Sequence, residues 1–478
     1  MIQYFQDLAQ LFRNKTLNVF GIERDFLTLV SDGDIEKAIQ LMDDNEDDVD
    51  LCINEYYPEK HKVMKRPNKI RQNQPAYITE KLPRNRQRFI NEVALFFLLN
   101  NPIKWRCNAE TDEENDAFRI FKEFIAESRF NTTIRQAKRL AGAETESAKV
   151  YNIYRNSKGE LDCKVVVASR SKGYKLRTLI DQYGTMKAFA LGYKTKENGK
   201  NVQHWDIQTD DFLFNCSRST IGWQVETFPN PTGKINIIYF HQKKEWDGVQ
   251  PLCEREEDVL SRLADNNNYF SDPIAAATAD VLMNMADPDA SGKMIQLSGD
   301  DSRFEYITPP QLASGWETEK EDLKSAILND SFTPDFSYEG IKGYGTLSGS
   351  ALRNAMVIGY VKRSNNLEIY EEGVAREVSV IKGYLALKYP QYDWNKLLIT
   401  FEFSEPFSDE RQKWWGAVAE AKNNGLISDQ SSVELACVVD DIDEELKRLK
   451  RQREEQAEAE AKAKMSAQKP IGFDPNKE

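Results

Sequence analysis

Residues 331–388 of the chain read SFTPDFSYEGIKGYGTLSGSALRNAMVIGYVKRSNNLEIYEEGVAREVSVIKGYLALK. The first third is rich in glycine, which has no Cβ and leaves the backbone free to turn. In the remainder, apolar residues recur at steps of three and four and predict one helix face: Leu367, Tyr370, Val374, Val378, Ile381 and Leu385. If unbroken from Ser348 to Lys388, this helix is roughly 60 Å long. The stretch therefore predicts a loop that leads into a long helix, around which we expect the rest of the chain to be organised.

The chain before this stretch predicts an α+β protein. Helical patterns cover residues 1–60, 86–100 and 112–145. From Val150 to His241 the apolar period changes to two, with turn-forming Gly, Asn and Pro between short runs, which predicts an antiparallel β-rich domain.

A third region lies between the β-rich domain and the glycine loop. It predicts a helix at 252–268, a break at Ser271-Asp272-Pro273, a second helix at 274–287, a β-hairpin at 294–308 and a helix at 310–330. After Pro390, which ends the long helix, we expect a strand at 396–404, a helix at 409–424 and a further helix from Ser428 or Asp429.

Composition excludes several classes of protein. The net charge of −13 argues against a protein that grips nucleic acid over a broad basic surface, although DNA could still pass an acidic wall without sticking. The longest apolar run, residues 93–99, is far shorter than the roughly 20 residues of a membrane helix. The cysteines are isolated and only three histidines exist, so neither a metal centre nor a cofactor is expected.

One basic segment stands out in this acidic chain. Residues 60–88 read KHKVMKRPNKIRQNQPAYITEKLPRNRQR. A segment of this kind can contact nucleic acid, or it can be a solvated connecting arm or an arm that binds a partner within an oligomer. A connecting arm or a partner-binding arm is favoured over a nucleic-acid contact, because the rest of the chain is acidic.

Motifs of catalysis are missing. The glycines of the loop do not have the spacing of a dinucleotide fingerprint, and no phosphate-binding loop, nucleophile elbow or HExxH motif is present. A carboxylate pair such as Asp206 and Asp211 in the β-rich domain could serve a hydrolase, but acidic pairs are common by chance among 77 acidic residues. A structural role is therefore predicted, with no enzymatic activity.

Four phrases, in order, resemble the portal proteins of tailed bacteriophages in the group with long non-contractile tails. They are IDQYGTMKAFALGY (180–193), LADNNNYFSDPIAAATADVL (263–282), GKMIQLSGDDSRFEYITPPQ (292–311) and FTPDFSYEGIKGYGTLSGSALR (332–353). No single phrase is sharp, but the ordered set covers about residues 50–450. The resemblance implies a portal fold with a discontinuous wing, a helical stem, a small α/β clip, a long kinked wing helix and a helical C-terminal crown.

The resemblance also implies domain boundaries. These are an N-terminal wing (1–250), a first stem helix (251–270), a clip (271–309), a second stem helix (310–332), a tunnel loop (333–349), the second wing part with the long helix and closing strand (350–408), a crown (409–464) and a disordered tail (465–478). Within the long helix, Gly359 is expected two or three turns from the start, where a kink would let the loop move.

In function, the resemblance implies a dodecameric ring at one capsid vertex of the virion, assembled in the host cytoplasm, through which double-stranded DNA is packaged and ejected. Implied partners are the terminase large subunit, a head–tail adaptor, the major capsid protein and scaffold, with no membrane. The loop residues expected near DNA are Lys342, Gly343, Tyr344, Gly345 and Thr346. Two alternatives remain open: a carboxylate-dependent hydrolase, and another virion structural or adaptor protein.

Overall fold

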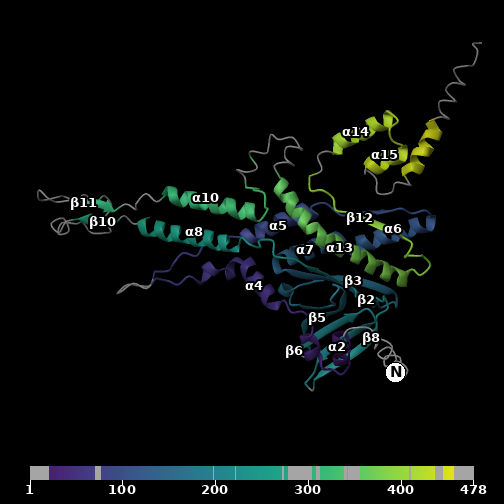
Figure 1. The fold of residues 1–478 in the computed structure, drawn as a ribbon, viewed down its shortest axis with the longest axis horizontal. Helices are drawn as coiled ribbons and strands as arrows, with labels where there is room; N and C mark the ends of the chain where they lie inside the picture. Colours follow the sequence, from purple (N-terminus) through teal and green to yellow (C-terminus); the bar gives the residue numbers. More distant parts are fainter. Residues whose placement is uncertain are drawn as a thin grey trace, which may run out of the picture. The chain divides into compact units, whose positions relative to one another are not determined.

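The computed structural model describes residues 21–69, 77–197, 199–220, 222–271, 274–277, 304–307, 313–337, 342, 356–407, 411–436 and 445–456. The chain divides into two compact units, one of residues 1–342 and 356–406 and one of residues 343–355 and 407–478. Helices and strands are both well represented in the first unit (Figure 1), so the predicted α+β class is confirmed.

The helices of the first unit are α2 (Gly21–Ser31), α3 (Ile35–Gln40), α4 (Glu46–Tyr56), α5 (Arg86–Leu99), α6 (Asp112–Glu127), α7 (Phe130–Glu144), α8 (Gln250–Ser271), α10 (Ala313–Asp330) and α13 (Val357–Lys388), with short 3-10 turns η2 (Pro58–Lys60), η3 (Lys62–Lys65) and η4 (Arg170–Lys172). Its strands are β1 (Lys104–Cys107), β2 (Glu146–Arg155), β3 (Leu161–Ala168), β4 (Lys175–Ile180), β5 (Met186–Glu197), β6 (Lys200–Thr209), β7 (Phe212–Arg218), β8 (Trp223–Pro229), β9 (Ile237–His241), β10 (Ile274–Ala277), β11 (Phe304–Ile307) and β12 (Ile399–Glu402).

The β-rich domain is antiparallel throughout, as predicted. One sheet has the order β3-β2-β9 and the other the order β4-β5-β6-β7-β8. Alternation along β5 explains their packing: Ala188 and Ala190 join a core with α2 and α3, whereas Phe189 and Leu191 join a core with β2, β3 and β9. The larger sheet is thus covered on both faces.

The long helix α13 forms the centre of the largest core. Its residues Tyr370, Val374, Val378, Ile381 and Leu385 are buried among side chains of α5, α6, α7 and all three strands of the β3-β2-β9 sheet. These are five of the six residues predicted to form one apolar face, and the sixth, Leu367, packs at the edge of the same core. The prediction of the helix and of its buried face is confirmed.

The start of the helix differs from the prediction. Met356 is a turn residue before the first residue of α13, Val357. Residues 343–355 lie outside the described residues. Gly359 therefore stands in the first turn of the described helix and not two or three turns along it.

Two other predictions are corrected by the structure. The expected helix at 112–145 is two helices, α6 and α7, because Arg129 between them takes a left-handed conformation with φ of 51° that no α-helix can continue through. Residues 274–277, expected to begin a helix, form strand β10 and pair with β11, Phe304–Ile307. The strand predicted at 294–297 lies outside the described residues. Residues 278–303 lie outside the described residues.

The second unit contains α14 (Arg411–Asn423), α15 (Asp429–Ala436) and a helical segment at 445–456. The indole N–H groups of Trp414 and Trp415 donate to the carbonyl oxygens of Leu435 and Ala436, each over 2.8 Å, and so cap the C-terminal end of α15. In the described part of the chain, no helix combines the length and the apolar character that a membrane span requires.

Gly359 permits a close approach between α13 and α5. A Cβ added at Gly359 would lie only 2.3 Å from Cζ of Phe97, and Phe97 is fully buried. The Phe97 ring is also held by Tyr360, with ring centroids 5.6 Å apart. The packing of two helices is thus a sufficient reason for glycine at this position, whether or not the helix bends there.

We predict that Gly359→Ala lowers the free energy of unfolding by about 1–2 kcal/mol, because overpacking against Phe97 outweighs the higher helix propensity of alanine. Gly383→Ala in the same helix is the matched control, since a Cβ there would lie 3.7 Å from Thr232 in ordinary contact. The control should gain up to about 1 kcal/mol. Urea denaturation measures both, and a stabilised Gly359→Ala variant would contradict the packing role.

Candidate functional site

Helices α8 and α10 form a pair that carries the β10–β11 hairpin beyond its far end (Figure 1). Cys253 of α8 and Ile327 of α10 share a small core, and Arg255 Nη2 lies 2.6 Å from Glu319 Oε1. A later residue of α8 thus meets an earlier residue of α10, so the two helices are antiparallel. The described bounds of α8 and α10 agree closely with the helices expected at 252–268 and 310–330.

The basic segment packs along α8 and meets acidic side chains of that helix. Arg86 forms a bidentate pair with Glu256, over 2.8 and 2.7 Å, and Arg66 Nη2 lies 3.1 Å from Asp265 Oδ2. His61 Nδ1 lies 2.6 Å from Glu257 Oε1, and both side chains are buried. We call residues 58–69 and 77–86, which are held in this way, the arm.

The backbone of the arm is tied to the same helix. The N–H groups of Glu80 and Arg84 donate to Asp265 and Glu257, each over 2.8 Å, and the N–H of Leu82 donates to Ser261 Oγ over 3.0 Å. Burial works to raise the pKa of Asp265, but the Glu80 N–H and the Arg66 guanidinium outweigh it and lower the value. The acids of α8 therefore neutralise a large part of the arm, which favours a connecting or partner-binding arm over a nucleic-acid contact.

The base of the helix pair is fastened to α13 by a buried charge cluster. Lys362 Nζ donates to the carbonyl oxygens of Ser331, just after α10, and of Glu245, just before α8, over 2.9 and 3.0 Å. It also lies 3.3 Å from Glu245 Oε2. One side chain of α13 thus reaches both ends of the pair where they enter the rest of the unit.

A second lysine completes this cluster. Lys138 of α7 is fully buried; it pairs with the Glu245 carboxylate and donates to Gln242 Oε1 over 3.1 Å and to Asn366 Oδ1 over 3.2 Å. Tyr370 donates from its hydroxyl to Gln242 Oε1 over 2.8 Å. We call Lys138, Gln242, Glu245, Lys362, Asn366 and Tyr370 the junction cluster.

The charges of the junction cluster shift one another. Burial alone would raise the pKa of Glu245, but Lys138 and Lys362 outweigh it and lower the pKa to about 2. Burial lowers the pKa of Lys362 to about 8 in spite of Glu245, and it also lowers the pKa of Lys138. The carboxylate is therefore held ionised at any physiological pH.

A separate buried pair fixes the middle of α13. Glu377 forms an ion pair with the Lys149 ammonium and accepts a hydrogen bond from the Tyr151 hydroxyl of β2, and all three side chains are fully buried. Lys149 Nζ also lies 4.1 Å from the centroid of the Phe130 ring. The sequence alone does not predict the junction cluster or the Lys149–Glu377 pair, because the partners are far apart in the chain. The signal that the sequence does carry is a polar residue four positions from another on an otherwise apolar helix face, as at Lys362 and Asn366.

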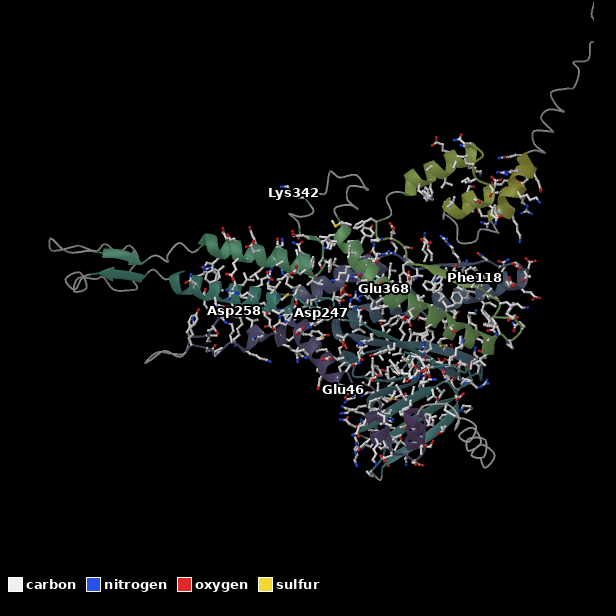
Figure 2. The ribbon with its side chains drawn as sticks, viewed as in Figure 1. Glu46, Phe118, Asp247, Asp258, Lys342 and Glu368 are labelled. Atoms are coloured by element: carbon white, nitrogen blue, oxygen red, sulfur yellow. The ribbon has the colours of Figure 1, made fainter. Side chains whose placement is uncertain are left out.

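The loop residues predicted to face DNA are almost all outside the described residues. Lys342 is described and is exposed (Figure 2), whereas Gly343, Tyr344, Gly345 and Thr346 are not. No contact of Lys342 bears on DNA, so the role of the loop stays a prediction.

The two carboxylates of the hydrolase hypothesis lie at different places in one β-hairpin. Asp206 lies within β6, opposite Asn215 of β7, and burial raises its pKa. Asp211 lies in the turn between β6 and β7. Among the described residues no group of His, Cys, Asp and Glu could hold a metal ion.

We predict that Glu245→Gln lowers the free energy of unfolding by about 3 kcal/mol or more, because two buried ammonium groups lose their counter-charge. Glu317→Gln, on the exposed side of α10, removes the same charge at the surface and should change the stability by less than about 0.5 kcal/mol. Denaturant titration of both variants measures the difference.

The contact of Glu245 with Lys138 and Lys362 also predicts that the free energy of unfolding depends on pH. The folded pKa of Glu245, about 2, is below the ordinary value of 4.5, so its contribution is present above pH 4.5 and is lost as the pH falls toward 2. The stability difference between the wild type and Glu245→Gln should therefore shrink as the pH falls below about 4.5. A difference that stays the same down to pH 2.5 would show that Glu245 is not held ionised by the lysines.

Among solved structures, one chain from the neck of an empty GTA particle, computed with C6 symmetry, is 10% identical, with 73% of this chain and 89% of that chain covered and a TM-score of 0.43. A chain from the neck of a native GTA particle, computed with C12 symmetry, is 11% identical, with 74% and 90% covered and a TM-score of 0.41. TM-scores below 0.5 are too low for either likeness to support an argument here. No curated protein matches the sequence.

The family comparison is decisive. The model of the phage portal protein family described as SPP1 Gp6-like matches residues 51–459. The match begins in α4 and includes the arm, the helix pair with its hairpin, the junction cluster, α13 and the second unit. It agrees with the span of the resemblance found in the sequence. The chain belongs to the SPP1 Gp6-like family of phage portal proteins.

Proposed function

We propose that about twelve copies of this chain form a closed ring at one vertex of a phage capsid and that double-stranded DNA enters and leaves through its central channel. The observation that carries the proposal is the family match over residues 51–459. The family is a structural one, and its phage origin implies a place in the virion. No catalytic role is proposed for any residue.

In this ring the α8–α10 pair serves as the stem, and the β10–β11 hairpin serves as the clip. The clip would meet the terminase large subunit during packaging and the head–tail adaptor afterwards. Residues 1–250 and 350–408 would form the wing against the major capsid protein and scaffold, and residues 409–464 the crown. The junction cluster supports this assignment, because force on the stem would pass through Lys362 and Glu245 into α13.

The electrostatics suit a conduit better than a DNA-binding protein. The net charge of −13 repels phosphates, and the arm cations Arg66 and Arg86 are already paired with acids of α8. The loop at 333–349 would narrow the channel, with Lys342 as a weak and transient contact to the phosphate backbone. A passage for any DNA sequence requires that bases are not read and that phosphates are not held.

We predict that deletion of residues 341–346 leaves the ring intact but impairs DNA packaging or retention, so that most particles stay empty. Negative-stain imaging and native mass spectrometry check the ring, and nuclease-protected DNA per particle checks packaging. A variant in which the same six residues are replaced by glycine and serine separates the effect of loop length from that of its side chains.

Normal packaging by the deletion variant would contradict the channel role of the loop. A wild-type protein that stays a monomer at every concentration would contradict the ring itself. An Asp206→Asn variant should behave like wild type in both assays, since no role for this carboxylate is proposed.

A further inference from the structure

The outer side of α10 is acidic and has no partner within the described chain. Glu317, Glu321 and Asp322 are exposed, and no ion pair or hydrogen bond links their carboxylates to any described residue. In contrast, Glu319 and Lys324 of the same helix are paired with Arg255 and Asp335. Glu319 and Lys324 therefore have ion-pair partners, whereas the carboxylates of Glu317, Glu321 and Asp322 have none among the described residues.

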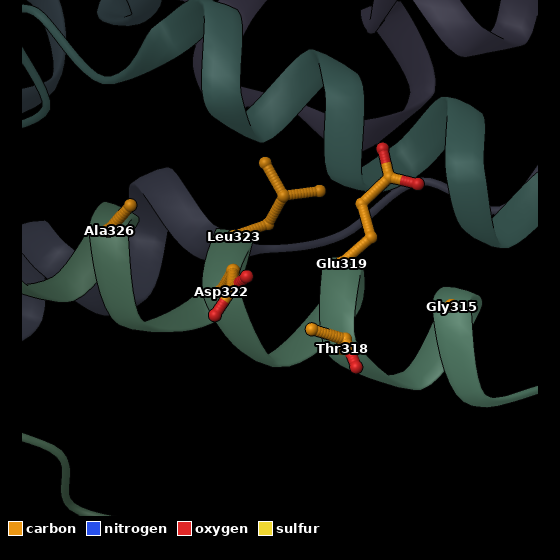
Figure 3. Close-up of a pocket in the computed structure, with 6 residues that line it drawn as sticks. All are labelled: Gly315, Thr318, Glu319, Asp322, Leu323 and Ala326. Carbon is orange, nitrogen blue, oxygen red and sulfur yellow. The ribbon is translucent and has the colours of Figure 1, made fainter.

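A shallow groove lies along α10 next to these carboxylates, and two of its lining side chains, Glu319 and Leu323, point toward α8 (Figure 3). Its volume is about 590 Å³, and it is lined by Gly315, Thr318, Glu319, Asp322, Leu323 and Ala326. Gly315 has open space around its Cα, and Leu323 and Ala326 are only half-buried. The groove thus offers a small apolar floor with carboxylates at its rim.

The outward side of the arm has the complementary character. Ile78 is 74% exposed and Leu82 is 39% exposed, unusual values for aliphatic residues in a packed segment. Lys65 and Lys69 are exposed beside them in the same segment, and no described carboxylate pairs with either. The inward cations of the arm bind α8, so an aliphatic and cationic surface remains on the other side.

The two surfaces cannot meet within one chain. The arm packs on α8, and α8 packs on α10, so α8 lies between them (Figure 1). In a cyclic ring each subunit presents one surface to the neighbour on one side and a different surface to the neighbour on the other. Two complementary surfaces, one on the arm beside α8 and one on α10, are what such a heterologous contact requires.

We propose that the arm of one subunit docks on α10 of the next, with Ile78 in the groove and with Lys65 and Lys69 against Glu321 and Asp322. This inference rests on the proposed ring and names the contact that would close it around the stem. The occupant of the groove is thus a second copy of this chain. The contact would make the stem acids internal to the ring and would leave fewer cations free to hold passing DNA.

Charge reversal tests the contact. Glu321→Lys/Asp322→Lys and, separately, Lys65→Glu/Lys69→Glu should each weaken self-association by at least about tenfold, measured by sedimentation velocity and native mass spectrometry of the full chain. The two changes combined in one chain should restore association, because both surfaces are then reversed. Glu123→Lys/Glu127→Lys, on the exposed side of α6, is the matched control and should associate like wild type.

A covalent test does not depend on stability. A chain carrying Ile78→Cys and Ala326→Cys should give a ladder of multimers with a short bis-maleimide, whereas each single variant should give dimers at most. The wild type, with its native thiols, supplies the background.

The outcomes separate the two proposals. If the wild type forms rings and neither reversal weakens them, or if the combined variant is not restored, or if no ladder forms, the docking inference is overturned and the ring stands. If the wild type forms no ring, the proposed function fails and takes the inference with it. Circular dichroism of each variant shows whether its fold is retained.

Discussion

The Glu245 carboxylate lies between two buried ammonium groups, and much of the first unit depends on this contact. Lys138 comes from α7, Lys362 from α13, and Glu245 from the segment between β9 and α8. A buried charge without a partner is so costly that the three segments must come together for any of them to be stable. Lys362 also holds the carbonyl that follows α10, so both ends of the helix pair are fixed to the long helix by a single side chain. Further along α13, Glu377 is a second buried carboxylate with partners from another element, the Lys149 ammonium and the Tyr151 hydroxyl of β2.

This arrangement suits a part that must transmit force. Apolar packing can slide, whereas a buried ion pair with additional hydrogen bonds tolerates little displacement before a charge is left unpaired. Under our proposal the stem is anchored at one end and carries at the other end the clip, which meets the packaging motor. The junction cluster and the arm together would keep the helix pair in a fixed direction, one from its base and the other along its side.

The sequence predicted the regular elements well and the irregular ones poorly. Helix α13, helix α5 and the antiparallel strands were predicted because strong periodicity coincides with burial, as at Tyr370, Val374 and Phe189. The break at Arg129 was missed, since a left-handed non-glycine residue leaves no signal in composition. Ile274–Ala277 was expected to be helical because alanine favours helices, and pairing with Phe304–Ile307 overrode this preference.

The role of the arm could not be predicted, because its acidic partners on α8 follow more than 160 positions later, as with Arg86 and Glu256. The loop at 343–346 remains a prediction throughout.

The most direct test of this account is an electron cryomicroscopy structure of the purified full-length chain. It should show a closed ring in which the α8–α10 pair of every subunit faces the central channel and Lys362 of α13 contacts Glu245 at the base of that pair. A chain that remains single at all concentrations, or a ring whose helix pairs point away from the channel, would contradict it.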